Sequence, residues 1–570
     1  MTRLQAFKRP AARLAATPLL LALVHCGGGI GNPSPQLAAA TPAALSGNCE
    51  ALAGTLAALA NTRITSATTV AAGTLKVAGK DLPEHCLVAG RMHERVSAVD
   101  GKAYAIAFEM RLPKAWNGRF LYQANGGLDG AIPPAVGAFA GGPTTNALYQ
   151  GFAVISSDAG HSGPTDYSFG IDPQARLDYG YQAVGKLTPM AKEVIRIAYG
   201  KGPDRSYIGG CSNGGRHAMV AAARYAEQYD GFLAGAPGFN LPKASINSIS
   251  KGQHYLTVAT NPADLSTAFT VAERAMVAQA VLARCDALDG AADGLVQDTN
   301  ACQAAFDLQR DVPTCTAARD GTCLSAAQKT AIASVFGGVV LSDGTPIYAS
   351  QAWDPGLSSA GLISWHFQSP VGLSAGNTGI VLKVPPENPV GFDTRAFSLG
   401  ANIDTLWAQI NATNATYTES ALSFMTPPNP TDLSRIKDRG AKMMVYQGVS
   451  DPVFMVNDTT AWYDGLRARN GGDASNFARV FRIPGMSHCS GGPATDQFDP
   501  LTALVAWVEQ GQAPDALIAT ARGAGNAGGA NAEVPADWAI NRTRPLCPYP
   551  KVARYNGSGS IDDAANFTCR

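Results

Sequence analysis

The stretch SYIGGCSNGGRHAMVAAARYAEQY, residues 206–229, places a serine at the junction of two kinds of local structure. Its start, SYIGG, is typical of a short β-strand, and RHAMVAAARYAEQY is rich in residues that favour a helix. Between them, residues 210–214 match the pattern G-x-S-x-G around Ser212. A strand, a sharp turn and a helix would present the serine hydroxyl beside the positive helix N-terminus, as a reactive nucleophile requires.

The pattern G-x-S-x-G occurs a second time, at residues 372–376 around Ser374. Ser374 lies between Pro370 and the segment NTGIVL, and no helix is predicted to follow it. We therefore expect Ser374 to be a loop serine, and we predict Ser212 to be the nucleophile.

Strand-like and helical segments alternate along the chain. Strands are predicted in AYAIAFEMRL (103–112), RFLYQ (119–123) and FAVISS (152–157), and a helix in MAKEVIRIAYG (190–200). Such alternation predicts a mostly parallel sheet with helices on both faces, and with the serine turn it indicates the α/β-hydrolase fold. The loop-rich residues 239–431 are predicted to form an inserted lid domain, which leaves a core in two parts, 49–238 and 432–570.

The acid and the base of a catalytic triad should follow the serine in this fold, in that order. Asp451 comes directly after the strand-like KMMVYQ, and His488 follows ARVFRI on a glycine-containing loop. His217 is on the helix that Ser212 begins, so its ring cannot easily turn back to the hydroxyl. The predicted triad is Ser212, Asp451 and His488.

Two cysteines flank this predicted site, because Cys211 precedes the nucleophile and Cys489 follows the base. If Ser212 is hydrogen-bonded to His488, the two neighbours come within the roughly 4.4–6.8 Å Cα separation of a disulfide. A Cys211–Cys489 bridge would hold the histidine loop against the serine turn. Two unrelated buried thiols are the alternative.

The N-terminus has the features of an export signal. Four basic residues precede an apolar run at residues 14–24, which is too short to span a membrane, so residues 1–26 are predicted to be a signal peptide. Cys26 followed by glycines leaves two alternatives open, a lipid anchor at Cys26 or simple export, and residues 27–48 are predicted to be a flexible tether. No transmembrane span is expected in the rest of the chain. The expected location is secreted, periplasmic or on the cell surface.

Charge and cysteine content narrow the class of protein further. The chain has 44 basic and 44 acidic residues, which gives no electrostatic footprint for nucleic acid. The chain has eleven cysteines, and ten of them remain when Cys26 is set aside. An even number of cysteines in an exported chain suggests disulfides. No C-x-x-C spacing supports a metal–thiolate site.

Residues 285–302, CDALDGAADGLVQDTNAC, contain the one strong metal-like motif. Asp286, Asp289 and Asp293 are clustered carboxylates separated by glycines, and hard oxygen ligands on such a curled loop suit calcium. The spacing is not that of an EF-hand. The alternative is a turn held by ordinary side-chain-to-backbone hydrogen bonds.

Several longer motifs resemble the tannase and feruloyl esterase family of α/β-hydrolases, and within it the bacterial branch that holds mono(2-hydroxyethyl) terephthalate hydrolases. They include LPEHC (82–86), WNGRF (116–120), YDGFLAGAPGFNLPKA (229–244), PGMSHCSGGP (484–493) and RTRPLCPYP (542–550). The resemblance extends from about Cys49 to Cys569.

The resemblance implies roles for further residues. The backbone N–H groups of Gly127 and Asn213 would form the oxyanion hole, and the calcium ligands would be Asp286, Asp289, Asp293 and the carbonyls of Ala291 and Leu295. Trp365 would cover the substrate, and Leu241, Ala244 and Phe454 would line the same cavity, although each of these four could equally be plain core. The implied disulfides are Cys49–Cys86, Cys211–Cys489, Cys285–Cys302, Cys315–Cys323 and Cys547–Cys569.

The sequence thus predicts an exported serine esterase that cleaves esters of aromatic acids, of the hydroxybenzoate, hydroxycinnamate or terephthalate type, without an organic cofactor. The alternatives are a mono(2-hydroxyethyl) terephthalate hydrolase proper, a tannase, or a non-catalytic ligand-binding surface lipoprotein. In the terephthalate-cleaving branch a lid arginine pairs with the free carboxylate of the substrate. The matching residues 365–382 contain no Arg or Lys, and Lys383 is the nearest basic residue. We therefore expect uncharged aromatic esters to be preferred.

Overall fold

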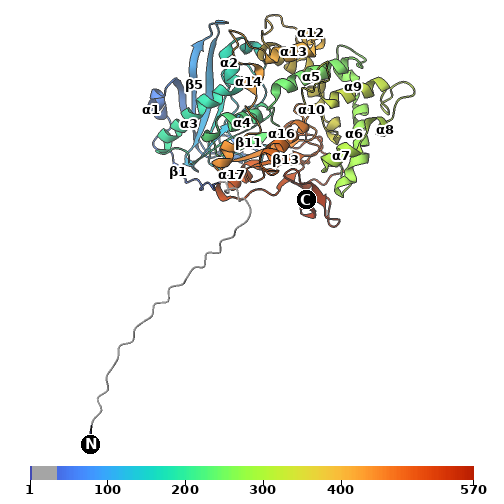
Figure 1. The fold of residues 1–570 in the computed structure, drawn as a ribbon. Helices are drawn as coiled ribbons and strands as arrows, with labels where there is room; N and C mark the ends of the chain where they lie inside the picture. Colours follow the sequence, from blue (N-terminus) through green and yellow to red (C-terminus); the bar gives the residue numbers. More distant parts are fainter. Residues whose placement is uncertain (3–34) are drawn as a thin grey trace. The chain divides into compact units, whose positions relative to one another are not determined.

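The computed structural model describes residues 1–2 and 35–570 (Figure 1). Most of the predicted signal peptide, Cys26 and the first part of the predicted tether lie outside the described residues. By tertiary contacts Ser34–Arg570 form one unit, separate from Met1–Pro33.

A nine-stranded mixed sheet forms the centre of the larger unit, in the order β13-β12-β11-β10-β8-β9-β6-β5-β2. The six strands from β13 to β9 run parallel, and β6, β5 and β2 continue the sheet antiparallel. This confirms the mostly parallel sheet of the α/β-hydrolase fold. The strands are β2 (Thr62–Val70), β5 (His85–Val96), β6 (Ala103–Pro113), β8 (Arg119–Gln123), β9 (Ala153–Ser157), β10 (Arg205–Cys211), β11 (Gly231–Gly235), β12 (Lys442–Gly448) and β13 (Ala478–Ile483).

The central strands are buried on both faces. Every residue of β9, β11 and β12 is buried, as expected for parallel strands that are covered by helices on both sides. The helices that belong to this core are α1 (Leu52–Thr55), α2 (Pro173–Leu177), α3 (Ala183–Tyr199), α4 (Asn213–Arg224), α16 (Val456–Arg469) and α17 (Pro500–Gln510).

The chain leaves the central sheet after β11 and returns to it at β12, so residues 236–441 form an insertion. Its helices are α5 (Leu241–Leu256), α6 (Val271–Cys285), α7 (Thr299–Ala305), α8 (Leu308–Asp311), α9 (Ala326–Gly337), α10 (Ala360–Leu362), α11 (Leu373–Gly376), α12 (Thr394–Gly400), α13 (Ile403–Asn411), α14 (Ala421–Met425) and α15 (Ser434–Asp438). Two π-helical turns, Ile363–Gln368 and Asn377–Leu382, flank α11. In Figure 1 the green and yellow helices α6 to α9 gather on the side of the unit away from β5.

Short strand pairs complete the fold. They are β1 (Ala43–Ala44) with β7 (Ala115–Trp116), β3 (Lys76–Val77) with β4 (Lys80–Asp81), β14 (Leu517–Thr520) with β15 (Thr543–Leu546), and β16 (Ala553–Tyr555) with β17 (Phe567–Cys569).

The described part of the predicted tether, residues 35–48, is attached to the core rather than free of it. Ala43 and Ala44 pair with β7, and the carboxylate of Glu509 accepts a hydrogen bond from the backbone of Ala40 at 2.9 Å. The expectation of a flexible tether is therefore wrong for these residues, because the core supplies hydrogen-bond partners that composition does not reveal.

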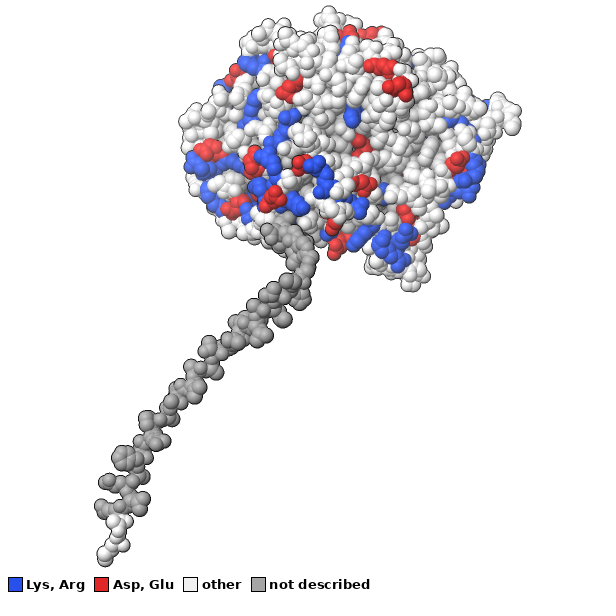
Figure 2. Space-filling model, in the orientation of Figure 1, with Lys and Arg blue, Asp and Glu red and all other residues white. Residues whose placement is uncertain are grey.

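Charged side chains on the visible face are of both signs and interspersed, without a large field of one sign (Figure 2). No helix among the described residues is long and apolar enough to cross a membrane.

Candidate active site

Ser212 occupies the sharp turn between β10 and α4. Its backbone is in a region that L-residues rarely adopt, with φ 65° and ψ −125°. Both flanking glycines are needed for this turn: a Cβ on Gly210 would lie 2.2 Å from the carbonyl oxygen of Ala124, and one on Gly214 would lie 2.3 Å from it. Close packing around the two glycines holds the strained backbone of this turn in place. The turn in this way presents the hydroxyl of Ser212 above the strand ends.

The three residues of the predicted triad lie together in hydrogen-bonding order. The Nε2 atom of His488 is 2.8 Å from the Oγ atom of Ser212, and its Nδ1 atom is 2.9 Å from the Oδ2 atom of Asp451. These distances allow the imidazole to take the serine proton while the carboxylate holds the ring in the required tautomer.

Asp451 is held as an acceptor by several donors. Gln447 donates to its Oδ2 atom at 2.7 Å, and the backbone N–H groups of Val453 and Phe454 donate to its Oδ1 atom at 2.9 and 3.1 Å. The side chain of Asp451 is fully buried. This shell fixes the orientation of the carboxylate, and through it the orientation of His488.

The Cys211–Cys489 disulfide joins the serine turn to the histidine loop. The Cα atoms are 6.0 Å apart, although the two residues are separated by 278 positions in sequence. All five implied disulfides are present, and the other four are Cys49–Cys86, Cys285–Cys302, Cys315–Cys323 and Cys547–Cys569.

The residues implied for the oxyanion hole adjoin the nucleophile. Gly127 and Asn213 line the same cavity as Ser212, and a Cβ on the neighbouring Gly126 would lie 3.7 Å from the Cβ of Ser212. The N–H of Asn213 is at the first position of α4, where a helix leaves its amides without an intrahelical acceptor. Both residues therefore adjoin the nucleophile, at the position that the resemblance implies for the oxyanion hole.

A buried polar network ties these two oxyanion segments together. Asp129, two residues after Gly127, accepts hydrogen bonds from the side-chain amide of Asn213 at 2.7 Å and lies 2.9 Å from the Nε2 atom of His217. Arg216 donates to Asn213 at 2.6 Å. The ring of His217 is thus engaged by Asp129 and has no hydrogen bond to the catalytic serine. Asp129 could not be predicted from sequence, because nothing in the surrounding pattern distinguishes it from a turn aspartate.

A pocket opens at Ser212. All four residues predicted to contact the substrate line it, namely Leu241, Ala244, Trp365 and Phe454. The rings of Trp365 and Phe454 both meet the ring of His488 edge-on, with centroids 5.4 and 5.5 Å away. The pocket wall is thus aromatic and aliphatic directly beside the catalytic histidine.

Ser374 differs from its expected place. It lies in the short helix α11 rather than in a loop, and a π-helical turn follows it, so the prediction of no helix there was wrong. It lines the pocket with its hydroxyl 2.9 Å from that of Ser369. The turn before it is not preceded by a strand, so it lacks the arrangement found at Ser212. Glycines in and beside the segment NTGIVL lower its helix propensity, so these helical turns are difficult to predict from the sequence.

A basic residue from outside the predicted substrate contacts also lines the pocket. Lys251, on α5, is 2% exposed and contributes to the pocket wall. Lys383, the nearest base to residues 365–382, is not among the lining residues and forms an ion pair with Glu387. The helical spacing of Leu241, Ala244 and Lys251 is the signal that could have placed Lys251 there.

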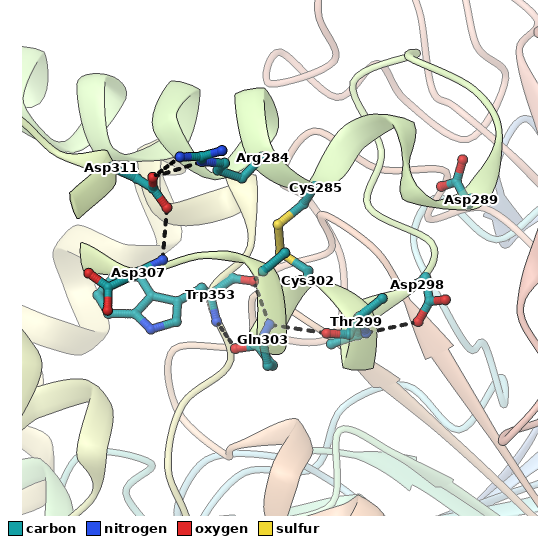
Figure 3. The surroundings of a disulfide bond; sticks show 12 residues. Arg284, Cys285, Asp289, Asp298, Thr299, Cys302, Gln303, Asp307, Asp311 and Trp353 are labelled. Carbon is teal, nitrogen blue, oxygen red and sulfur yellow. Dashed lines mark hydrogen bonds and ion pairs between the residues drawn. A yellow bond between two sulfur atoms is a disulfide. The ribbon is translucent and has the colours of Figure 1, made fainter. Parts of the chain in front are cut away.

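The aspartate-rich loop is closed at its base by the Cys285–Cys302 disulfide (Figure 3). The carboxylates accept hydrogen bonds from loop backbone: Asp286 from Gly294, Asp289 from Ala291 and Gln297, and Asp293 from Leu295, all at 3.0 Å. Among the described residues, no three His, Cys, Asp or Glu side chains converge into a group that could hold a metal.

The donor chemistry of this loop nevertheless suits a hard cation. Asp289 is buried, and burial raises the pKa of its carboxyl group to about 7, with the carboxylates of Asp293 and Asp286 adding to the shift. A carboxylate has about four acceptor sites, so the backbone hydrogen bonds, and for Asp293 the additional ion pair with Arg544, leave acceptor sites free. Carboxylate and carbonyl oxygens are the ligand types that calcium prefers.

The fold and the site together define a class of protein. A serine on a strand–turn–helix elbow, bonded to a histidine and a buried aspartate from the loops after β13 and β12, is the arrangement of a serine hydrolase with the α/β-hydrolase fold.

Comparisons with known proteins identify the family. Residues 86–570 match the model of the family described as "Tannase and feruloyl esterase", and the chain belongs to this family of carboxylic-ester hydrolases. The chain is 40% identical over 526 residues to the mono(2-hydroxyethyl) terephthalate hydrolase of Piscinibacter sakaiensis, covering 86% of this chain and 85% of that protein. It is 29% identical over 478 residues to the probable feruloyl esterase B-1 of Neosartorya fischeri, covering 81% and 82%.

A solved structure agrees with this assignment. The crystal structure of feruloyl esterase B from Aspergillus oryzae superposes with a TM-score of 0.72 at 26% identity, over 92% of this chain and 99% of that one. The tannin acyl hydrolase from Aspergillus niger has the same fold, with a TM-score of 0.68 at 19% identity over 93% and 96% of the two chains.

Proposed function

We propose that this hydrolase cleaves esters of aromatic carboxylic acids through an acyl-enzyme on Ser212. The observation that carries the proposal is the pocket beside the triad, whose wall includes Trp365, Leu241 and Phe454. Flat aromatic groups bury large areas and pack favourably against such walls. The relatives support it, since their names refer to terephthalate, feruloyl and tannin esters.

The geometry supplies each step of acyl transfer. The hydroxyl of Ser212 attacks the ester carbonyl while His488 takes its proton, and the buried carboxylate of Asp451 stabilises the imidazolium that forms. The N–H groups of Gly127 and Asn213 would stabilise the oxyanion. His488 then returns the proton to the leaving alcohol, and a water molecule repeats the sequence to release the acid.

A panel of methyl esters tests the acyl preference. We expect kcat/KM for methyl benzoates and methyl hydroxycinnamates to exceed that for methyl hexanoate at least tenfold, because the pocket wall is aromatic. A preference for the aliphatic ester would contradict the aromatic assignment. Hydrolysis of none of these esters would favour a non-catalytic ligand-binding protein.

We further infer that the chain is exported to an oxidising compartment. Five disulfides support this inference, because such bonds persist in secreted and periplasmic proteins and are rare in the cytosol. The leader-like N-terminus points the same way. Lipid attachment at Cys26 and release without an anchor remain alternative forms of this proposal.

We also propose that the aspartate loop binds one calcium ion through Asp286, Asp289, Asp293 and the carbonyls of Ala291 and Leu295. A cation there would neutralise carboxylates that the loop brings together in partly buried positions. Its role would be structural, because the loop contributes no residue to the pocket at Ser212.

Chelation should lower the melting temperature without abolishing turnover at low temperature. A ligand that binds only the folded state stabilises it by about 2.7 kcal/mol at a hundredfold excess over its Kd, and the chelator removes that amount. Melting curves with EDTA and with added calcium measure the effect, and Asp289→Asn should abolish the calcium-dependent difference. Identical melting with and without calcium would support the plain-turn interpretation.

A further inference from the structure

The wall of the pocket contains a buried ammonium group. Leu241, Ala244, Ser248 and Lys251 are spaced three or four residues apart on α5 and all line the pocket. The start of α5 lies near the nucleophile, since the N–H of Gly238 donates to the carbonyl of Ser212 at 3.2 Å. With a rise of about 1.5 Å per residue, Lys251 is about 15 Å further along the helix axis than Leu241. The backbone of Lys251 thus lies well along the helix from the end that is nearest to Ser212, and its ammonium contacts the carbonyl of Pro452.

Lys251 has no anionic partner in contact. Its Nζ atom donates to the carbonyl of Pro452 at 3.0 Å and lies 3.3 Å from the Nε2 atom of His366. Among the described residues it forms no ion pair with a carboxylate. A buried ammonium without an anion is costly, and an anionic ligand that enters the pocket would offset that cost.

Two further polar groups in the wall of this pocket lack hydrogen-bond partners. The hydroxyl oxygen of Ser248 and the Oδ1 atom of Asn377 are buried, have no hydrogen-bond partner in the protein, and belong to residues that line the same pocket. Ser248 is three residues before Lys251 on α5, so the two side chains lie on one face of the helix. Unpaired buried groups of this kind are expected where a ligand supplies the missing partner.

We propose that Lys251, with Ser248, binds a free carboxylate on the acyl group and so makes the enzyme selective for monoesters of aromatic dicarboxylic acids. This inference rests on the proposed function, because it concerns the acyl side of the same pocket. The proposal reverses the expectation that uncharged aromatic esters are preferred, which was based on the absence of Arg and Lys from residues 365–382. The cation comes from a helix more than a hundred positions earlier in the sequence, and not from that stretch or from Lys383.

The selectivity should depend on pH through Lys251 itself. Burial lowers the pKa of Lys251 to about 7, and the carboxylate of Asp451, on the loop after β12, acts in the opposite direction. His366, from the π-helical turn, is kept neutral because burial and the charges of Lys251 and Arg274 hold its pKa well below the usual value. Burial raises the pKa of Tyr255, whose hydroxyl is 2.6 Å from His366, so it stays neutral too.

The sign of the effect follows from these charges. Below about pH 7 Lys251 is an ammonium that can pair with a carboxylate, and above it the free enzyme holds a neutral amine. The preference for an acidic substrate should therefore fade as the pH rises. Any ionisation that the hydrolysis of both esters requires cancels in the ratio of their kcat/KM values.

The test compares two esters that differ only in charge, methyl 4-carboxybenzoate and methyl 4-carbamoylbenzoate. They have the same leaving group and nearly the same shape. For the wild-type enzyme we expect kcat/KM to be at least tenfold higher for the carboxylate at pH 6, and the ratio to fall at least fivefold by pH 8.5. Added salt should weaken the preference only slightly if the pair is buried.

Three variants assign the effect to Lys251. Lys251→Met should remove the preference and its pH dependence. Lys251→Arg should retain a preference that no longer falls with pH, because a guanidinium does not titrate in this range. Lys383→Met is the matched control and should leave the ratio and its pH profile as in the wild type, since Lys383 is paired with Glu387 outside the pocket lining.

The outcomes separate this inference from the proposed function. Hydrolysis of both esters with a ratio at or below one at every pH would overturn the role of Lys251 and leave the esterase assignment standing. Faster turnover of methyl 4-hydroxybenzoate than of the carboxylate at pH 6 would also overturn it, in favour of a pocket for neutral phenolic acids. Failure to hydrolyse any of the three esters would refute the proposed function and this inference with it. Because the wild-type ratio is itself decisive, the test does not depend on the variants folding.

Discussion

Ser212→Ala should lower kcat by about 10⁴- to 10⁶-fold while leaving the fold intact. The hydroxyl of Ser212 is the one placed 2.8 Å from the Nε2 atom of His488, and alanine offers no atom for the acyl-enzyme. Alanine must still adopt a φ of 65°, as serine does, so stability should change little. Residual hydrolysis would come from the oxyanion groups and from binding alone.

Ser374→Ala provides the matched control for this loss. Ser374 has the same local sequence pattern and lines the same pocket, but its hydroxyl lies beside Ser369 and not beside a histidine. We expect its kcat to fall less than tenfold. Loss of activity in Ser374→Ala together with retention in Ser212→Ala would show that the nucleophile is misassigned. Burst kinetics with a p-nitrophenyl ester would detect the acyl-enzyme directly.

Replacing both Cys211 and Cys489 with alanine should lower both stability and turnover. The bridge closes a loop of 278 residues, and removing such a disulfide from an exported protein costs about 2–5 kcal/mol of unfolding free energy. It also fastens His488 to the serine turn, and a misplacement of about 1 Å can cost about 10²-fold in rate. We expect kcat to fall between tenfold and a hundredfold at a temperature where the variant remains folded.

The bridge at the C-terminus gives the comparison that separates these two effects. Cys547→Ala with Cys569→Ala removes a bridge across 22 residues that does not adjoin the pocket. This variant should lose stability without a comparable loss of kcat. An unchanged kcat in the Cys211 and Cys489 variant, or a free thiol at Cys211 in the native protein, would contradict the positioning role.

The triad could be predicted from sequence because each member follows a recognisable strand. Asp451 and His488 come directly after β12 and β13, and neighbouring parallel strands bring the loops at their ends together. Ser212 carries its own local pattern. The fold class and these three positions therefore depend on short-range signals, which the sequence contains in full.

Other parts of the site depend on contacts between distant segments. Lys251 reads in isolation as an ordinary helix lysine, and its place in the pocket becomes visible only when α5 packs beside Trp365 and Pro452. Asp129 gains its role only from the approach of α4. The helical turns around Ser374 were missed because glycine weakens helix propensity, and tertiary packing overrides that weakness here.

The position of the lid in the chain has a consequence for how the enzyme matures. Residues 236–441 are synthesised after Ser212 and before Asp451 and His488. The triad can therefore form only after a segment of more than two hundred residues has been synthesised between its members. Closing a loop costs more entropy as it lengthens, and distant contacts form slowly. The bridges across 17 and 8 residues should therefore close first, and the bridge across 278 residues last. Esterase activity should then appear in oxidative refolding at the same time as that final bond. The rate of ester hydrolysis would therefore measure the fraction of the protein that has completed folding.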